Sequence, residues 1–508
     1  MIDRRGFLLL TFGLSGCSAA SQRVSEFPLV IRGGRVIDPD QGLDMSTDLA
    51  IDGTRVAAIG PKLRGRVALD AVGCVVAPGF LDLHSHAQTV SAHRLQALDG
   101  VTTTLELEAG AFPVAAAYGR ASVEGRPLNY GYSASWAGAR IEAFAGDRGR
   151  GQAMMTRLPD PAWQREATAA EEDRILGMLE TELDAGGLGI GVLLGYAPGT
   201  SRGEYLRVAR LAAARRVPTY THVRDLIEVN PDTRMDGGEE LVRAAAETGA
   251  HMHFCHVNSS SGRHVGRVLA LVDRVRREGS LVTTEAYPYG AGMTAIGAVF
   301  LAPERLAARG LRPTDIVYIP TNERIRDAEQ LRRLRATDPG GGCIVHFLDE
   351  TRAADAAILR ASLFHEDTIV ASDAIPLSGM VAGADWAWPL PPHARTHPRT
   401  AGTFGRSFRR LVVEGKMSIF EFIRRASLLP ARVVTIADGG PLSKGTLAVG
   451  ADADVVVFDP DAFHDRATYE ASTQPSAGVR HLLVGGEPLI RDGALLPYAR
   501  PGRPVRRL

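Results

Sequence analysis

The chain has 508 residues, of which 45% are hydrophobic and 23% are charged, and its 58 basic side chains balance 58 acidic ones. This length and composition are typical of a soluble globular enzyme with one large domain and a smaller one. The zero net charge gives no reason to expect nucleic acid or an anionic membrane surface as a partner.

The first residues resemble an export signal. Arg4 and Arg5 precede a short apolar stretch that ends at Leu14, an order that resembles a twin-arginine signal. Residues 14–17, Leu-Ser-Gly-Cys, resemble a bacterial lipobox, which implies cleavage before Cys17 and a lipid on that cysteine. We therefore predict a signal peptide at 1–16, a tether at 17–26 and an exported periplasmic or cell-envelope lipoprotein. The alternative is a frayed hydrophobic N-terminus of a cytoplasmic protein.

No segment of the chain has the length and the lack of charge of an ordinary membrane-spanning helix. We therefore expect contact with a membrane only through the lipid anchor. Apart from Cys17, the chain has Cys74, Cys255 and Cys343, an odd and sparse set that does not make a disulfide framework.

Both ends of the chain carry short alternating strands with turn residues between them. We predict that 27–78 and 436–508 are two parts of one small β-sandwich domain. Between them, at 79–435, apolar strands alternate with amphipathic helices, which predicts an α/β fold with a (β/α)8 TIM-type barrel. Residues 300–342, rich in Arg, Asp and Gly, interrupt this alternation and predict an insertion over the barrel mouth. The clearest predicted helices lie at 204–216, 239–248 and 263–278.

Potential metal ligands stand at the ends of several predicted barrel strands. The first two are two residues apart, so on a strand both imidazoles project to one side. Ligands at the ends of different parallel strands converge at one face of a barrel, and imidazole and carboxylate donors suit a Zn²⁺-type site that activates water. The set consists of His84, His86, His222, His256 and Asp373.

This ordered set resembles the amidohydrolase superfamily, whose pattern is His-x-His, a bridging ligand, His, His and Asp. The resemblance implies a cofactor of one or two divalent metal ions, most simply Zn²⁺. It also implies that Asp373 is the catalytic residue that takes the proton of the attacking water and passes it to the leaving amine.

The bridging ligand requires a separate prediction. Many amidohydrolases use a carboxylated Lys, but this chain has no Lys between residues 63 and 415. N-acyl-D-amino-acid deacylases have a Cys near the end of the second strand, where a gapless alignment places Ala109. Glu108, next to it, is the predicted bridging metal ligand, with Glu106 on the same strand face as the second candidate. The alternative is that these glutamates form salt bridges with arginines.

Three further stretches resemble the N-acyl-D-amino-acid deacylase branch, known as D-aminoacylases. They are Gly-Tyr-Ala-Pro-Gly at 195–199, Glu-Ala-Tyr-Pro-Tyr at 285–289 and Thr-His-Pro-Arg-Thr-Ala-Gly-Thr-Phe at 396–404. The resemblance implies that Arg399 and Tyr287 hold the carboxylate of the substrate, which a guanidinium can bind through two parallel hydrogen bonds. The alternatives are a structural ion pair for Arg399 and ordinary core packing for Tyr287.

Three more residues are predicted to line the substrate site. Asn258 stands where the family often has a Lys that helps to bind the carboxylate, so the chain departs from the pattern there. Tyr196, or Arg224 just after His222, is predicted to steady the developing oxyanion.

The sequence therefore predicts a metal-dependent hydrolase that cleaves the amide bond of N-acyl-D-amino acids. Two alternatives stay open. A dipeptidase or a cyclic amidase of the hydantoinase or dihydroorotase type can use the same scaffold, since fold alone does not separate these activities. A non-catalytic anchored binding protein is the other, although a purely structural metal would not need Asp373. The sequence does not specify the acyl group, the amino-acid side chain, the number of metal ions or the oligomeric state.

Overall fold

The computed structural model describes residues 26–145, 157–380, 383, 386–438 and 443–507. The predicted signal peptide at 1–16, Cys17 and all but the last residue of the predicted tether at 17–26 lie outside these ranges. None of the helices in the described ranges has both the length and the apolar character that crossing a membrane requires. Cys74, Cys255 and Cys343 are buried free cysteines.

Eight parallel strands form the central sheet, in the order β17-β12-β11-β10-β9-β8-β7-β6. Its two edge strands meet, because the His86 backbone N–H donates to the Ala374 carbonyl at 2.7 Å and the Ser372 N–H donates to Asp82 Oδ1 at 3.0 Å. The predicted (β/α)8 barrel is therefore confirmed. The strands are β6 (Phe80–Asp82), β7 (Val101–Ala111), β8 (Asn129–Ser135), β9 (Ile190–Leu193), β10 (Thr219–His222), β11 (Met252–Phe254), β12 (Val282–Ala286) and β17 (Ile369–Val370).

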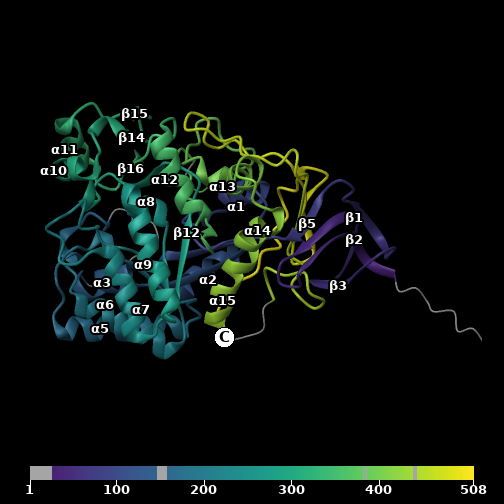
Figure 1. Cartoon of the computed structure of the whole chain (residues 1–508), viewed down its shortest axis with the longest axis horizontal. Coiled ribbons are helices and arrows are strands. Elements are labelled where there is room, and N and C mark those ends of the chain that lie inside the picture. The colour runs from purple at the N-terminus through teal and green to yellow at the C-terminus, as the bar shows by residue number, and fades with distance from the viewer. Residues whose placement is uncertain (1–25, 146–156, 381–382, 384–385, 439–442, 508) are drawn as a thin grey trace, which may run out of the picture.

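Helices cover the outside of the barrel, as parallel strands with two buried faces require (Figure 1). Ser201 and Asp236 begin two of them, because each side chain accepts a hydrogen bond at 3.0 Å from the backbone N–H three residues on. The three helices predicted from the sequence all form. The helices around the barrel include α1 (Val90–Leu98), α2 (Val114–Glu124), α3 (Trp136–Ala145), α5 (Ala169–Asp184), α6 (Arg202–Arg215), α7 (Gly237–Thr248), α8 (Val257–Ser261), α9 (Val265–Arg277), α12 (Ala353–Phe364), α13 (Arg399–Phe408), α14 (Ile419–Ile423) and α15 (Leu429–Asp438).

The two ends of the chain build one nine-stranded sheet, in which β5 from the first part pairs with β18 from the second. Figure 1 shows the purple strands of the first part beside the yellow end of the chain, at one side of the barrel. Hydrogen bonds run through all nine strands, since β1 pairs with β2, β4 and β5. The strands are β1 (Glu26–Asp38), β2 (Leu43–Asp52), β3 (Arg55–Gly60), β4 (Arg64–Asp70), β5 (Val75–Pro78), β18 (Val455–Phe458), β19 (Val479–Val484), β20 (Glu487–Arg491) and β21 (Ala494–Leu495).

The last residues leave this sheet and pack along the barrel. Tyr118 Oη donates to the Val505 carbonyl at 2.6 Å, and the Val505 N–H donates to the Tyr130 carbonyl at 2.7 Å. The segment predicted as the second part of the β-domain, 436–508, therefore also includes a terminal stretch around Val505 that packs against strand β8 of the barrel.

The predicted insertion has its own small sheet, in the order β13-β16-β14-β15. It starts directly after β12 and runs from 291 to 346, so it is wider than the predicted 300–342. In Figure 1 it stands at the upper left, above the ends of the barrel helices. Its elements include β13 (Ala291–Ala295), α10 (Pro303–Leu306), β14 (Ile316–Tyr318), β15 (Glu323–Arg324), α11 (Ala328–Thr337) and β16 (Gly342–His346).

Candidate metal centre

Six predicted ligands meet at the carboxyl-terminal rim of the barrel, where the ends of parallel strands converge. Two of the turns that carry them need unusual backbone, because His256 and Asp373 have φ values of 33° and 48°. Both residues therefore enter the cluster from turns with left-handed backbone. The six residues, from β6, β7, β10, β11 and β17 or the turns that follow them, are His84, His86, Glu108, His222, His256 and Asp373.

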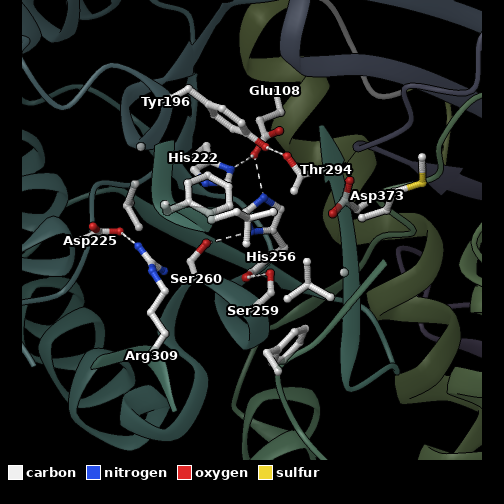
Figure 2. Close-up of a pocket in the computed structure, with 18 of the residues that line it drawn as sticks. Glu108, Tyr196, His222, Asp225, His256, Ser259, Ser260, Thr294, Arg309 and Asp373 are labelled. Carbon is white, nitrogen blue, oxygen red and sulfur yellow. Dashed lines mark hydrogen bonds and ion pairs between the residues drawn. The ribbon is translucent and has the colours of Figure 1, made fainter. Parts of the chain in front are cut away.

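The Glu108 carboxylate faces two pairs of histidines with different oxygens. Figure 2 shows one of these pairs, His222 and His256, beside Glu108. Glu108 Oε2 is 3.3 Å from His84 Nε2 and 3.5 Å from His86 Nε2. Its Oε1 is 3.1 Å from His222 Nδ1 and 2.7 Å from His256 Nε2. One carboxylate thus stands between two sets of imidazole nitrogens.

Asp373 completes the first set. Its Oδ1 lies 3.5 Å from the Nε2 atoms of both His84 and His86, and its Oδ2 lies 2.9 Å from Arg399 Nη1. Burial alone would raise the pKa of Asp373, but the charges of Arg399 and His84 outweigh it and hold the pKa below its usual value. The carboxylate is therefore ionised at neutral pH and can accept a proton.

The donor set fits divalent metal ions. Ligand atoms of His84, Glu108 and His256 lie within 4.8 Å of one another, and so do those of His84, His86 and Asp373. Burial raises the pKa of Glu108, but the surrounding histidines hold it well below its usual value, so the carboxylate carries a charge. Imidazole nitrogens with anionic oxygens are ligands that Zn²⁺ takes, and one carboxylate can serve two ions.

Glu106, the second candidate for a bridge, lies outside the centre of the cluster. Both of its carboxylate oxygens are 2.9 Å from His86 Nδ1. It therefore accepts the ring N–H on the far side of His86 and sets the orientation of that ring.

Glu285 has the same function for His84 and was not predicted. It hydrogen-bonds to His84 Nδ1, while its other oxygen is 3.0 Å from His253 Nε2. The His256 backbone N–H also donates to Glu285 Oε1 at 3.1 Å. The position of Glu285 near the end of a barrel strand is the sequence feature that indicates a function at the metal centre. In the stretch 285–289 the sequence analysis predicted a function only for Tyr287.

Arg399 and Tyr287 lie together beside Asp373. The guanidinium carbon of Arg399 is 4.8 Å from the centre of the Tyr287 ring, and Arg399 is only 1% exposed. Within the described ranges, none of its three guanidinium nitrogens makes a hydrogen bond of good geometry, although Asp373 is in ion-pair range. A methyl group at Gly292 would come within 3.0 Å of Tyr287 Oη, so glycine keeps the space next to both residues open.

Tyr196 also lies where the sequence predicted. Its ring centre is 4.8 Å from that of His222, and its hydroxyl is hydrogen-bonded to Thr294 Oγ1 at 2.8 Å. Burial raises the pKa of Tyr196 well above its usual value, so the hydroxyl keeps its proton. A neutral donor therefore stands beside the histidine pair.

Arg224 has contacts that differ from its predicted oxyanion role. Its Nε donates to Glu240 Oε2 at 2.8 Å, and Nη1 and Nη2 donate to the carbonyls of Pro198 and Thr200 at 2.9 and 3.1 Å. These bonds hold the guanidinium within the wall and support a structural function.

The Asn258 side chain likewise hydrogen-bonds to the backbone of Tyr287 and does not point into the pocket. Its Nδ2 donates to the Tyr287 carbonyl at 3.1 Å, and the Tyr287 N–H donates to Asn258 Oδ1 at 3.4 Å. The amide thus fixes the segment that carries Tyr287, which a Lys at this position would not do in the same way.

A pocket opens over the cluster, and the insertion forms one of its walls (Figure 2). The barrel contributes polar side chains to it, while 292–311 and 345–347 contribute mainly apolar ones. The sequence showed the insertion but not which of its side chains turn inward. The labelled residues of the pocket are Glu108, Tyr196, His222, Asp225, His256, Ser259, Ser260, Thr294, Arg309 and Asp373.

Comparison with known proteins agrees with this geometry. The model of the amidohydrolase family matches residues 67–490. N-acyl-D-glutamate deacylase from Alcaligenes xylosoxydans xylosoxydans is 32% identical over 94% of this chain and 96% of its own length. N-acyl-D-aspartate deacylase from the same organism is 27% identical over 93% of this chain and 94% of its own length.

A solved structure extends the likeness to three dimensions. The N-acyl-D-glutamate deacylase of Bordetella bronchiseptica, crystallised with zinc and a phosphonate inhibitor, superposes with a TM-score of 0.74 at 27% identity, over 95% of this chain and 100% of that one. A D-aminoacylase structure, 23% identical with a TM-score of 0.73 and the same coverage, shares the fold. The chain therefore belongs to the amidohydrolase family, in its N-acyl-D-amino-acid deacylase branch.

Proposed function

We propose that this protein is a zinc-dependent hydrolase that cleaves the amide bond of N-acyl-D-amino acids. The observation that carries the proposal is the Glu108 carboxylate between two histidine pairs, with the ionised Asp373 beside one of them. The deacylase relatives that cover nearly the whole chain support the same reaction class.

Each residue of the site has a separate function in the proposed reaction. The four histidines, Glu108 and Asp373 would hold Zn²⁺, which would supply Lewis-acid activation of the attacking water and of the scissile carbonyl. Asp373 takes the proton of the attacking water as the new C–O bond forms, and returns it to the amine nitrogen as the C–N bond breaks. Arg399 and the protonated Tyr287, whose pKa burial raises to about 12, hold the substrate carboxylate. Tyr196 donates to the carbonyl oxygen as its charge develops.

A hydrolysis screen tests the proposal. The zinc-loaded protein is incubated with N-acetyl-D-amino acids, their L-enantiomers, D-dipeptides, hydantoins and dihydroorotate. We expect release of acetate from D-substrates only, and loss of that activity on chelation and its return with Zn²⁺. Turnover of a cyclic amide without turnover of any N-acyl-D-amino acid would show that the cyclic-amidase alternative is right.

We expect Glu108→Gln to lower the metal content sharply, because a neutral amide cannot place an anionic oxygen toward both histidine pairs. Metal analysis of the purified variant measures this directly. Glu106→Gln is the comparison variant: because Glu106 orients the His86 ring only from its far side, its loss should lower the metal content less than Glu108→Gln does. Equal metal content and equal activity in the wild type and Glu108→Gln would contradict the bridging function.

We also propose that the protein is exported in folded form and anchored by a lipid on Cys17. The support is the sequence alone: Arg4 and Arg5 before an apolar stretch, and the lipobox that ends at Cys17. Metabolic labelling with a fatty acid should mark the wild type and not Cys17→Ala, and replacement of both arginines by lysine should keep the protein in the cytoplasm. Labelling that persists in Cys17→Ala would refute the anchor.

A further inference from the structure

The wall of the pocket that the insertion supplies is mainly apolar, with Thr294 and Arg309 as its polar side chains. Phe300 stacks nearly parallel to the His222 ring, with 6.1 Å between ring centres, and lies 5.2 Å from the ring centre of Tyr196. A substrate group on the side of His222 that faces the insertion therefore meets the Phe300 ring. The apolar residues of this wall are Met293, Phe300, Leu301, Leu311 and Val345 from the insertion and Phe347 directly after it.

Among the described residues that the insertion contributes to this wall, Arg309 carries a positive charge, and that charge is already offset. Arg309 forms an ion pair with Asp225 through its Nη2, and its guanidinium carbon lies 5.3 Å from the centre of the Phe300 ring. The other oxygen of Asp225 accepts a hydrogen bond from Asn230 at 3.0 Å. The Arg309 and Asp225 side chains are 20% and 14% exposed, so water screens the pair only in part. Figure 2 shows the pair on the opposite side of His222 from Asp373.

A carboxylate that entered from the substrate side chain would be penalised twice on this wall. It would lose its hydration against Phe300 and its neighbours, and it would meet the negative charge of Asp225 as well as the positive charge of Arg309. Arg224, a guanidinium that the barrel contributes to the same pocket, is held by Glu240 and two carbonyls. An aliphatic or aromatic side chain loses no charge hydration and is not repelled by Asp225, and its burial against the wall is favourable.

We infer that the enzyme selects N-acyl-D-amino acids with apolar side chains, in contrast to the acidic amino acids in the names of its two deacylase relatives. This inference rests on the proposed function, and assigns the apolar wall to the amino-acid side chain. The Asp225–Arg309 pair excludes acidic side chains, because it occupies with an internal carboxylate the cation that would otherwise bind them.

The direct test compares kcat/KM of the zinc-loaded enzyme for N-acetyl-D-leucine, -methionine and -phenylalanine with those for N-acetyl-D-glutamate and -aspartate. N-acetyl-D-glutamine serves as the neutral equivalent of glutamate. We expect the apolar substrates to exceed glutamate by roughly a hundredfold, with glutamine between them. Glutamate at or above leucine would overturn the inference and leave the proposed function intact, whereas no hydrolysis of any D-substrate would mean that the proposed function itself has failed.

The charge pair has its own test. Asp225→Asn frees Arg309, so the ratio of kcat/KM for glutamate to that for leucine should rise by roughly tenfold, and adding Arg309→Gln should abolish the gain. Asp232→Asn, an exposed aspartate in the same loop, is the matched control. An unchanged ratio in Asp225→Asn would contradict the assignment. If that variant does not fold, Arg309→Gln alone tests the assignment. A selective loss of glutamate turnover would show that Arg309 binds acidic side chains in the wild type and would contradict the inference, whereas an unchanged ratio of glutamate to leucine turnover would support it.

Phe300→Ala separates the side chain from the acyl group. With the acetyl group constant, the variant should lose most activity toward D-leucine and D-phenylalanine, and little toward D-alanine. With D-alanine constant, lengthening the acyl chain from acetyl to hexanoyl should affect the wild type and the variant alike. If only the acyl series responds to Phe300→Ala, the apolar wall holds the acyl group and the inference is wrong.

Discussion

Replacing Asp373 with asparagine should reduce kcat by roughly a thousandfold, while most of the metal stays bound. The amide keeps an oxygen near His84 and His86 but cannot take up a proton, so proton transfer from water to the leaving amine loses its carrier. Metal content and steady-state rates on the same preparation measure the two effects separately. A variant that keeps its metal and retains activity within tenfold of the wild type would show that another group carries the proton.

Replacing Arg399 with alanine should reduce kcat/KM by roughly a hundredfold for substrates with a free carboxylate, because a desolvated charge-assisted pair is lost. The structure adds a second consequence, since Arg399 Nη1 also lies 2.9 Å from Asp373 Oδ2. Without that charge the pKa of Asp373 should rise. The activity of the variant should then fall off at a higher pH on the acidic side than that of the wild type, because the base must be ionised to act.

Amidated substrates separate these two functions of Arg399. For a substrate with a carboxamide in place of the carboxylate, Arg399→Ala should reduce kcat/KM only by the effect that acts through Asp373. Arg399→Lys should restore only part of the carboxylate-dependent activity. Arg395→Ala is the matched control, since Arg395 donates to the carbonyls of Pro392 and Ala394. Equal losses for charged and amidated substrates would show that Arg399 acts only by positioning Asp373.

Much of the site could be predicted because local sequence and strand order carry it. The spacing of His84 and His86 places both on one side of a strand, and parallel strands bring His222, His256 and Asp373 to the same rim. The lack of Lys across the barrel excludes a carboxylated-Lys bridge and favours a carboxylate such as Glu108. None of these inferences needs the packing of distant segments.

The remaining features depend on contacts that sequence neighbours do not reveal. Arg224 and Asn258 follow two ligands closely, but Glu240 and the Tyr287 backbone determine where their polar groups point. Glu285 acts on His84, 201 residues away in the chain. Residue spacing alone does not distinguish side chains that hold neighbouring residues in place from side chains that face the substrate.

The family, the barrel with its small β-domain from both chain ends, and the candidate ligands could all be predicted from the sequence, because periodicity and strand order are local properties that the fold repeats. The folded structure places Glu108 and not Glu106 between the histidine pairs, since Glu108 contacts all four imidazoles whereas Glu106 contacts His86 from its far side. It also decided the apolar wall and the pairing of Arg309 with Asp225, 84 residues apart. Burial and charge in a pocket arise from segments that meet only when the chain has folded, and these properties set the substrate.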